Sequence, residues 1–327
     1  MSGRARIGIS GWRYAPWRGT FYPQGLAQKR ELEFASRQLP TLEINGSFYS
    51  LQRPASYRAW HAATPDDFVF AVKGGRYLTH LLRLKNTRAA LANFFASGVL
   101  ELKEKLGPIL WQLPPHLRFN AEVVDEFLAA LPRSSVEAAA VAKRHDDKLK
   151  FQPATRAHGD RPLRYAMEVR HSSFETPEFI ALLRKHGVAL CVADSDGRWP
   201  LAYDVTADFI YCRLHGRSRL YASGYSAPAL DRWATLIRAW QAGDEERDTR
   251  HLSPRAPPRS RGRDVHVYFD NDSKVRAPYD AANLLARVNG TPRVVFPRRH
   301  RARGEAPRSV WPAWQGVTAR RAAGAAP

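Results

Sequence analysis

Eight short segments rich in β-branched and aromatic residues recur along the chain, and most are separated by a stretch with helical periodicity. Strands that alternate with helices form parallel sheets through right-handed crossovers. Eight such units in 327 residues predict an α/β fold, a closed (β/α)8 barrel of the TIM type. An open doubly wound sheet is the alternative. A glycine-rich fingerprint should then follow the first strand, and Ser10-Gly11-Trp12-Arg13 is not one.

The expected strands cover about 6–10, 41–49, 68–73, 109–113, 164–170, 188–193, 208–214 and 264–269. The expected helices cover about 29–38, 87–103, 121–131, 177–186, 227–241 and 278–288, with a further helix that begins at Pro54. The region 132–163 has no clean strand pattern, and we expect only a turn or the remains of a strand there.

Positive charge is concentrated in two segments of a chain whose net charge is +20. Residues 247–263 contain six arginines and one acid, and residues 297–327 contain seven arginines and one acid, so together they carry +11. Both are also rich in Pro, Ala, Gly and Ser, a composition typical of disorder. We therefore expect one barrel domain over 1–296 with a flexible insert at about 243–263, followed by a basic, disordered tail over 297–327.

Membrane and secreted classes are disfavoured by the same sequence. It has no run of about 18 apolar residues, and the N-terminal MSGRARIGIS lacks the apolar stretch of a signal peptide. Cys191 and Cys212 both lie in apolar strand-like runs, as expected for buried thiols rather than a disulfide or a metal pair. We expect a cytoplasmic protein without a membrane partner.

Polar side chains gather where the expected strands end. In the segment Thr41 to Tyr49, a period of two places Glu43, Asn45 and Ser47 on one face and Leu42 and Ile44 on the other. The carboxyl ends of barrel strands and the loops after them carry active sites, and charged groups there are costly unless paired. The recurrence of this layout in strand after strand predicts one polar pocket at the carboxyl end of the barrel.

The candidate catalytic residues are Glu43, Glu168, Asp194 and His215. The candidate substrate-binding residues are Ser10, Trp12, Asn45, Tyr49, Lys73, His80, Gln112, Arg170, His171, Arg213, Tyr268 and Asn271, and no residue is assigned to a metal. A set of ion pairs that closes the barrel mouth, for example between Glu168 and Arg213, is the structural alternative and is compatible with a pocket.

An ordered set of short motifs resembles the DUF72 family, also called YecE-like proteins. The motifs are SGW, LEINGSFY, FVFAVK followed by TH, WQLPP, MEVRHSSF, YCRLHG and VYFDND, between about residues 7 and 288. Family positions map onto Ser10, Gly11, Trp12, Glu43, Asn45, Phe48, Tyr49, Lys73, Thr79, His80, Gln112, Pro114, Glu168, Arg170, His171, Asp194, Arg213, His215, Gly216 and Asn271. Gly46-Ser47, the insert and the tail depart from the pattern. The resemblance implies a TIM barrel and supplies no established activity.

The preferred hypothesis is an enzyme, a hydrolase or lyase, that acts on an anionic and possibly phosphorylated substrate without a required cofactor. Lys73, Arg170 and Arg213 would hold a phosphate or carboxylate, and Glu43 or Glu168 would act as a base with help from His215. Two inward carboxylates also permit a glycosidase-like pair. Surrounding cations would however keep both carboxylates ionised, whereas one must donate a proton.

Two alternatives stay open. A divalent metal could be bound by carboxylates and histidines, in a barrel that resembles the endonuclease IV and xylose isomerase group in general layout, although no ligand spacing is diagnostic. Nucleic acid could instead be bound by the Arg-rich insert and tail through counterion release, with Trp12, Tyr14 and Trp17 either stacking on bases or capping the barrel.

Overall fold

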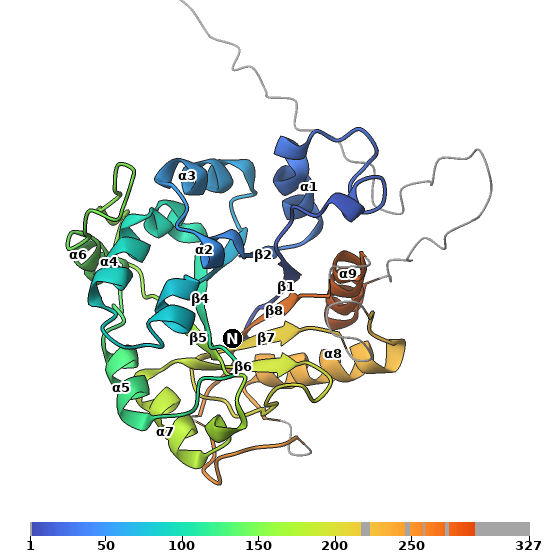
Figure 1. Cartoon of the computed structure of the whole chain (residues 1–327). Coiled ribbons are helices and arrows are strands. Elements are labelled where there is room, and N and C mark those ends of the chain that lie inside the picture. Colours follow the sequence, from blue (N-terminus) through green and yellow to red (C-terminus); the bar gives the residue numbers. More distant parts are fainter. Residues whose placement is uncertain (1, 217–222, 246–248, 258, 272–274, 292–327) are drawn as a thin grey trace, which may run out of the picture.

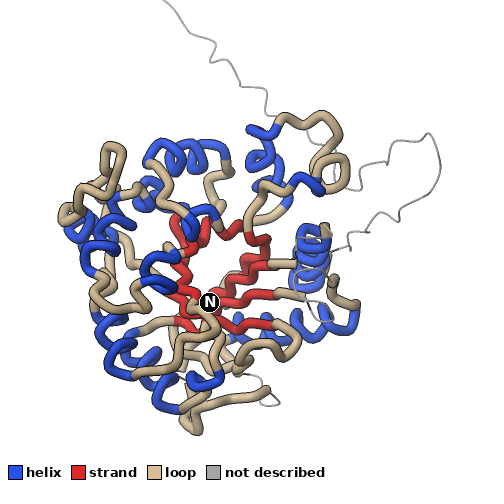
Figure 2. The backbone as a smooth tube through the Cα atoms, in the orientation of Figure 1, coloured by secondary structure: helices blue, strands red, loops and turns tan. Residues whose placement is uncertain are grey.

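The structure is a computed structural model that describes residues 2–216, 223–245, 249–257, 259–271 and 275–291. Within these residues, eight parallel strands close a barrel in the order β1 to β8, and helices surround it (Figures 1 and 2). The expected TIM-type fold is therefore confirmed. The strands are β1 Ala5–Ser10, β2 Thr41–Ile44, β3 Val69–Lys73, β4 Leu106–Gln112, β5 Tyr165–Glu168, β6 Ala189–Asp194, β7 Phe209–Leu214 and β8 Asp264–Phe269.

The helices are α1 Glu31–Gln38, α2 Gly46–Tyr49, α3 Pro54–Ala63, α4 Arg88–Ala96, α5 Ala121–Ala129, α6 Ser135–Ala142, α7 Pro177–His186, α8 Ala227–Ala242 and α9 Arg276–Asn289. Sequence signals explain several of their ends. The side chains of Asn120, Ser134, Thr176 and Ser226 accept a hydrogen bond from the first turn of α5, α6, α7 and α8. None of the helices in the described ranges is long and apolar enough to cross a membrane.

Alternate residues of each strand belong to two separate cores. The outward set, such as Leu190 and Val192 of β6, packs in the large apolar layer between strands and helices. The inward set is narrower and fills the barrel with residues such as Ala71, Ala193 and Tyr211. Because strand side chains alternate between faces, the parity of a residue number within its strand determines whether its side chain can reach the barrel mouth.

Three local expectations were wrong. The strand expected over 41–49 ends at Ile44, and a single helical turn, α2, follows. The helix expected over 87–103 stops after Ala96 because Gly98 adopts a left-handed conformation with φ of 107°, and a 3-10 segment continues over Val99–Lys105. The region 132–163 contains α6, although its Ala-rich sequence carries little amphipathic signal.

Described residues of the Arg-rich insert contact the loops that follow β5 and β6. The backbone N–H groups of Leu252 and Ser253 donate to the Asp204 carboxylate, and Arg250 pairs with Glu175 at 2.6 Å. Arg263, at the end of the insert, is buried. The basic tail, 297–327, lies outside the described residues, as do 246–248 and 258.

Candidate active site at the carboxyl ends of the strands

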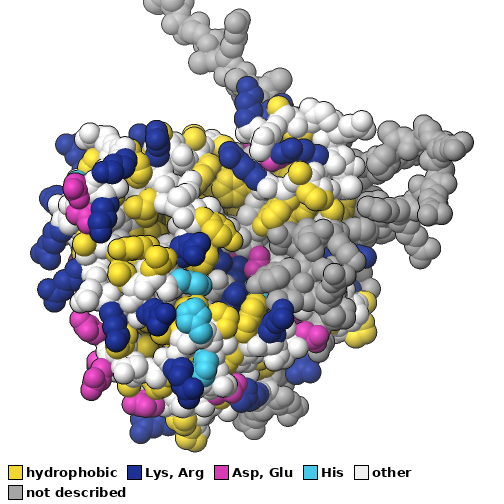
Figure 3. All heavy atoms as spheres, viewed as in Figure 1, with side chains coloured by type: hydrophobic (Ala, Val, Ile, Leu, Met, Phe, Trp, Pro, Cys, Tyr) yellow, Lys and Arg dark blue, Asp and Glu magenta, His cyan; other side chains and the backbone are white. Residues whose placement is uncertain are grey.

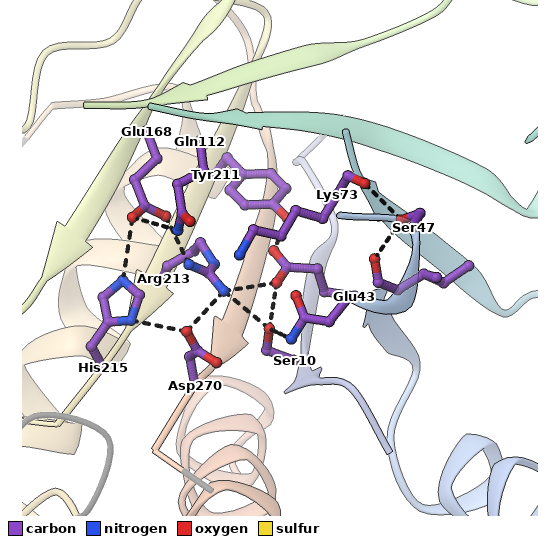
Figure 4. Close-up of polar contacts among 12 residues, drawn as sticks. Ser10, Glu43, Ser47, Lys73, Gln112, Glu168, Tyr211, Arg213, His215 and Asp270 are labelled. Carbon is purple, nitrogen blue, oxygen red and sulfur yellow. Dashed lines mark hydrogen bonds and ion pairs between the residues drawn. The ribbon is translucent and has the colours of Figure 1, made fainter. Parts of the chain in front are cut away.

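Parallel pairing brings polar residues of different strands to the same level of the barrel. Ser10 of β1 is in register with Glu43 of β2, and Gln112 of β4 is in register with Glu168 of β5. All four have the inward parity of their strands. Their side chains therefore converge inside the barrel with Arg213 from β7, as Figure 4 shows.

Arg213 is the centre of this cluster. Its Nη1 donates to Glu168 Oε2 at 2.8 Å, and its Nη2 lies 2.9 Å from Glu43 Oε1 and 2.8 Å from Asp270 Oδ2. Nη2 also lies 3.1 Å from Ser10 Oγ. One guanidinium thus joins carboxylates from β2, β5 and the loop after β8. Arg213, Glu43 and Glu168 each have 0% of their surface exposed.

Neutral groups occupy the remaining carboxylate oxygens. Tyr211 donates its hydroxyl to Glu43 Oε2 at 2.5 Å, and Ser10 donates to Glu43 Oε1. Gln112 Nε2 donates to Glu168 Oε1 at 2.9 Å. Buried charges are tolerated when they are paired and hydrogen-bonded, and each of these carboxylates has both kinds of contact. Arg213 Nε is the exception among the nitrogens of the guanidinium, since it is buried without a hydrogen-bond partner among the described residues. We call this set the Arg213 network; it comprises Ser10, Glu43, Gln112, Glu168, Tyr211, Arg213, His215 and Asp270.

His215 and Arg170 extend the network toward the surface. His215 lies with Nδ1 3.1 Å from Asp270 Oδ2 and Nε2 3.8 Å from Glu168 Oε1. Arg170 donates through Nε to Glu168 Oε1 at 2.7 Å, and its guanidinium lies 3.7 Å above the centre of the Trp199 ring. That stacking on Trp199 fixes the orientation of the guanidinium plane.

The charges of the network shift its proton equilibria in one direction. Burial alone would raise the pKa of Glu168, but Arg170 and Arg213 outweigh it and hold the pKa well below its ordinary value. Asp270 behaves in the same way, with its pKa lowered by Arg213 against the effect of burial. Both groups are carboxylates at neutral pH, so neither can act as the proton donor that a glycosidase pair requires.

Lys73 differs from the other charged groups of the site. It ends β3, with 7% of its surface exposed, and its Nζ lies 4.3 Å above the centre of the Phe48 ring. Among the described residues, Nζ has no hydrogen-bond or ion-pair partner. Burial and the nearby Arg213 lower the pKa of Lys73 to about 8, and the three carboxylates offset this only in part.

Further basic side chains surround His80 in the loop after β3. Burial lowers the pKa of His80 to about 4, and its neighbours Lys73, Arg170, Arg76 and His116 act in the same direction. Those four with His80 form what we call the basic rim. Figure 3 shows Lys, Arg and His side chains side by side near the centre of the face, over the ring of strands seen in Figure 2. The cations of the rim therefore lie above three carboxylates that share one guanidinium.

The structure brings together most of the predicted site residues. Ser10, Glu43, Asn45, Lys73, Gln112, Glu168, Arg170, Arg213 and His215 lie in or against the Arg213 network, with Asn45 donating to Ser10 Oγ at 2.8 Å. His80 lies beside them in the basic rim.

Strand parity explains why three predicted residues lie elsewhere. Asp194 has the outward parity of Leu190 and Val192, and its carboxylate adds to the effect of burial in raising the pKa of the Tyr225 hydroxyl. Asn271 also follows the outward residues of its strand and donates to Asp280 of α9 at 2.8 Å. His171 is the outward neighbour of Arg170, and its Nδ1 accepts from the backbone N–H of Ser173 at 3.1 Å.

Three more predicted residues are displaced along the barrel axis or into other layers. Trp12 is buried and packs edge-to-face on Trp60. Tyr49 lies on α2 with 71% of its surface exposed. Tyr268 lies inside the barrel below the network, with its hydroxyl 2.9 Å from Thr41 Oγ1. Trp12 and Trp17 are both buried in the core, so neither ring is exposed on the surface for stacking on a base.

The candidate lists drawn from the sequence omit three members of the site. Asp270 and Tyr211 share the inward parity of Tyr268 and Arg213, so parity alone could have identified them. Trp199 could not have been found in this way, because it lies in the 195–207 link, which has no periodicity.

The donor set does not fit a metal ion. Nowhere in the described ranges are three His, Cys, Asp or Glu side chains placed to hold one. The carboxylates that point toward one another, Glu43, Glu168 and Asp270, already share the guanidinium of Arg213. That cation lies where a divalent ion would have to bind. Cys191 and Cys212 are buried free thiols, as expected.

Comparison with known proteins agrees with this architecture. A family model described as "Protein of unknown function DUF72" matches residues 6–304. The UPF0759 protein YunF of Bacillus subtilis (strain 168) is 28% identical over 114 residues, which are 33% of this chain and 39% of YunF. The match therefore spans less than half of that relative's length.

Two solved structures share the fold. A DUF72 family protein from Thermotoga maritima MSB8 has a TM-score of 0.66 at 22% identity, over 88% of this chain and 99% of that one. A DUF72 family protein from Enterococcus faecalis V583 has a TM-score of 0.62 at 16% identity, over 87% of this chain and 95% of that one. At these identities the likeness supports the barrel and leaves its chemistry to be argued from the site.

Proposed function

Because the chain belongs to the DUF72 family, whose function is unknown, we propose a function from the site itself. The protein is an enzyme of hydrolase or lyase type that binds a small anionic substrate at the carboxyl ends of its barrel strands. The observation that carries this proposal is the basic rim: Lys73 has no carboxylate partner among the described residues, while Arg213 pairs with all three carboxylates of the network.

A simple charge comparison supports an anionic ligand. Glu43, Glu168 and Asp270 are balanced by Arg213, Arg170 and Lys73, and Arg76 then leaves the mouth positive. Clefts of one charge sign, with walls of low dielectric, raise the local concentration of the opposite ion. A phosphate or carboxylate held between Lys73 and Arg170 would receive charge-assisted hydrogen bonds from both.

The network limits the kind of chemistry that can follow. Glu168 is ionised at neutral pH, so its available role is proton acceptor or charge stabiliser. His215, next to Asp270 and Glu168, is the group of the network best suited to carry a proton between them. This arrangement favours abstraction of a proton from a bound substrate or water over protonation of a leaving group by a carboxylic acid.

The test is calorimetric titration of the full chain with inorganic phosphate, glycerol 3-phosphate and citrate at low ionic strength. We expect saturable one-to-one binding of at least one anion, weakened about tenfold or more in Lys73→Met and Arg170→Met, since a charge-assisted bond contributes about 1.5–3 kcal/mol. Lys185→Met, on the outer surface beside Asp125, is the matched control and should bind normally. Absence of saturable binding, or equal loss in the control, would contradict the proposal.

Nucleic-acid binding is a second candidate, favoured by the charge of +11 carried by 247–263 and 297–327. Its test is binding of a labelled single-stranded oligonucleotide at several salt concentrations, by the full chain and by a chain that ends at 296. If the tail drives binding, deletion should lower both the affinity and its salt dependence. Affinity that survives the deletion undiminished would contradict a tail-driven role.

A further inference from the structure

We propose that Lys73 is a nucleophile whose amine condenses with the carbonyl carbon of an anionic aldehyde or ketone bound at the basic rim. This inference rests on the proposed function and names its substrate class: small carbonyl compounds that carry a phosphate or a carboxylate. Arg170 and His80 would hold the anionic group, and Lys73 would form a covalent imine with the carbonyl group.

The position of the amine is the first argument. Lys73 lies at the end of β3, and its backbone carbonyl is fixed by the Ser47 hydroxyl at 2.6 Å. Its Nζ lies over the apolar Phe48 ring. Figure 4 shows the Lys73 side chain pointing toward the centre of the site. A lysine desolvated against an apolar surface and next to another cation is the arrangement that activates amines as nucleophiles; the other cation here is Arg213.

A second buried lysine shows that burial alone does not leave a lysine amine without hydrogen-bond acceptors. Lys105 is also buried, yet its Nζ donates to the carbonyl oxygens of His61 at 2.7 Å and Thr64 at 2.8 Å. A purely structural lysine in this protein is thus fixed by acceptors. Lys73 has no such acceptors among the described residues, so its lone pair is available once the proton is lost.

The reactive form of the amine is the neutral one. The charged groups that face Lys73 are Arg213 from β7, Glu43 from β2, Glu168 from β5, Asp270 after β8 and His80 after β3. With a pKa of about 8 in place of 10.5, the neutral fraction at neutral pH is about 300-fold larger than for an ordinary lysine.

The condensation is balanced without a further reactant. The nitrogen lone pair attacks the carbonyl carbon, the C–N bond forms, and a proton passes from nitrogen to the carbonyl oxygen to give a carbinolamine. The C–O bond then breaks, and the oxygen leaves as water with both protons of the original amine. The products are one imine and one water, and no oxidant or reductant is consumed. An imine draws electrons from the adjacent carbon, which fits a lyase.

The experiment is reductive trapping with matched probes. The full chain is incubated with glyoxylate or glyceraldehyde 3-phosphate and sodium cyanoborohydride, and the modified lysines are mapped by peptide mass spectrometry. Glycolate and glycerol 3-phosphate, which lack the carbonyl, serve as competitors and are titrated by calorimetry. We expect Lys73 to be modified at least tenfold faster than Lys105 and the exposed Lys150, with a rate that rises through about pH 8 and is slowed by the matching alcohol.

Lys73→Arg separates the amine's two roles, because arginine keeps the positive charge but does not form the imine. We expect this variant to bind glycerol 3-phosphate or glycolate and to lose the rapid modification. If an alcohol binds wild-type protein but Lys73 is labelled no faster than Lys150, the imine is overturned and the anion site stands. If neither alcohol binds, the proposed anion site fails. If Lys73 is nevertheless labelled in that case, the amine reacts without an anion site, and the assignment of anionic carbonyl compounds as substrates is overturned. Mapping in the wild-type chain decides between these outcomes even if the variant is unstable.

Discussion

Arg213 collects its partners from strands that are far apart in sequence: Ser10, Glu43, Glu168 and Asp270. Only a planar guanidinium offers several donors at fixed angles to carboxylates on different sides. The same residue therefore pairs with all three buried acids and, within the described part of the chain, leaves Lys73 without a carboxylate of its own. Stability and the proposed chemistry depend on the same side chain.

Replacement of Arg213 by methionine should lower the free energy of unfolding by about 3–5 kcal/mol, because three buried carboxylates lose their shared cation. Urea unfolding followed by circular dichroism measures this change. The control is Arg30→Met, which removes a partly exposed pair with Glu33 and should cost about 1 kcal/mol or less. Equal losses in the two variants would mean that the network contributes little to stability.

The lowered pKa of Glu168 makes the stability of the folded protein depend on pH in a defined direction. Its folded pKa is below the ordinary 4.5, so its contribution is present above about pH 4.5 and is lost as the pH falls toward the folded value. In Glu168→Gln that contribution is absent at every pH. We expect the difference in unfolding free energy between wild type and variant to shrink between pH 5 and pH 3; a constant difference would contradict the assignment.

At the scale of the elements, the sequence pattern predicted most strands to within a few residues because alternation and turn residues are local signals. The polar cluster was predictable for the same reason, since barrel strands deliver their carboxyl ends to one rim. Asp194 and Asn271 were assigned to that rim without regard to parity, which places both outside the barrel. The ion pairs of the site were not predictable. Nothing in the order of residues along the chain indicates that the buried carboxylates would pair with Arg213 and not with Lys73.

The boundary between α4 and the segment Val99–Lys105 depends on Gly98. A Cβ added there would lie 2.5 Å from the Pro54 Cα, and φ is 107°. Gly98→Ala should therefore cost more than the about 1–2 kcal/mol of a left-handed alanine, by a further 1–3 kcal/mol, roughly, for the clash. Gly25→Ala, with φ of 80° and open space around the new methyl group, is the matched control. Equal destabilisation in thermal or urea unfolding would show that the backbone contact relaxes freely.

At the scale of the whole molecule, the positive charge of the Arg-rich insert and that of the basic rim have different surroundings. Part of the charge of the insert is used internally, as the pairing of Arg250 with Glu175 shows. The basic rim instead gathers at the carboxyl end of the strands, above carboxylates that share the Arg213 guanidinium. Closure of the barrel produces this layering, because it places side chains from eight strands around one axis. Composition alone could not distinguish the charge of the insert from that of the rim, since each Lys or Arg adds one unit to the net charge of +20 wherever it lies in the fold.

The central claim is that this rim binds a small anion between Lys73 and Arg170. The most direct measurement is an anomalous difference map from a crystal of the full chain soaked in selenate, a tetrahedral anion that scatters anomalously. The account predicts a selenium peak within hydrogen-bond reach of Lys73 Nζ and the Arg170 guanidinium, which disappears when glycerol 3-phosphate is added in excess. Selenate peaks confined to arginines on the outer surface, with none at the mouth of the barrel, would contradict it.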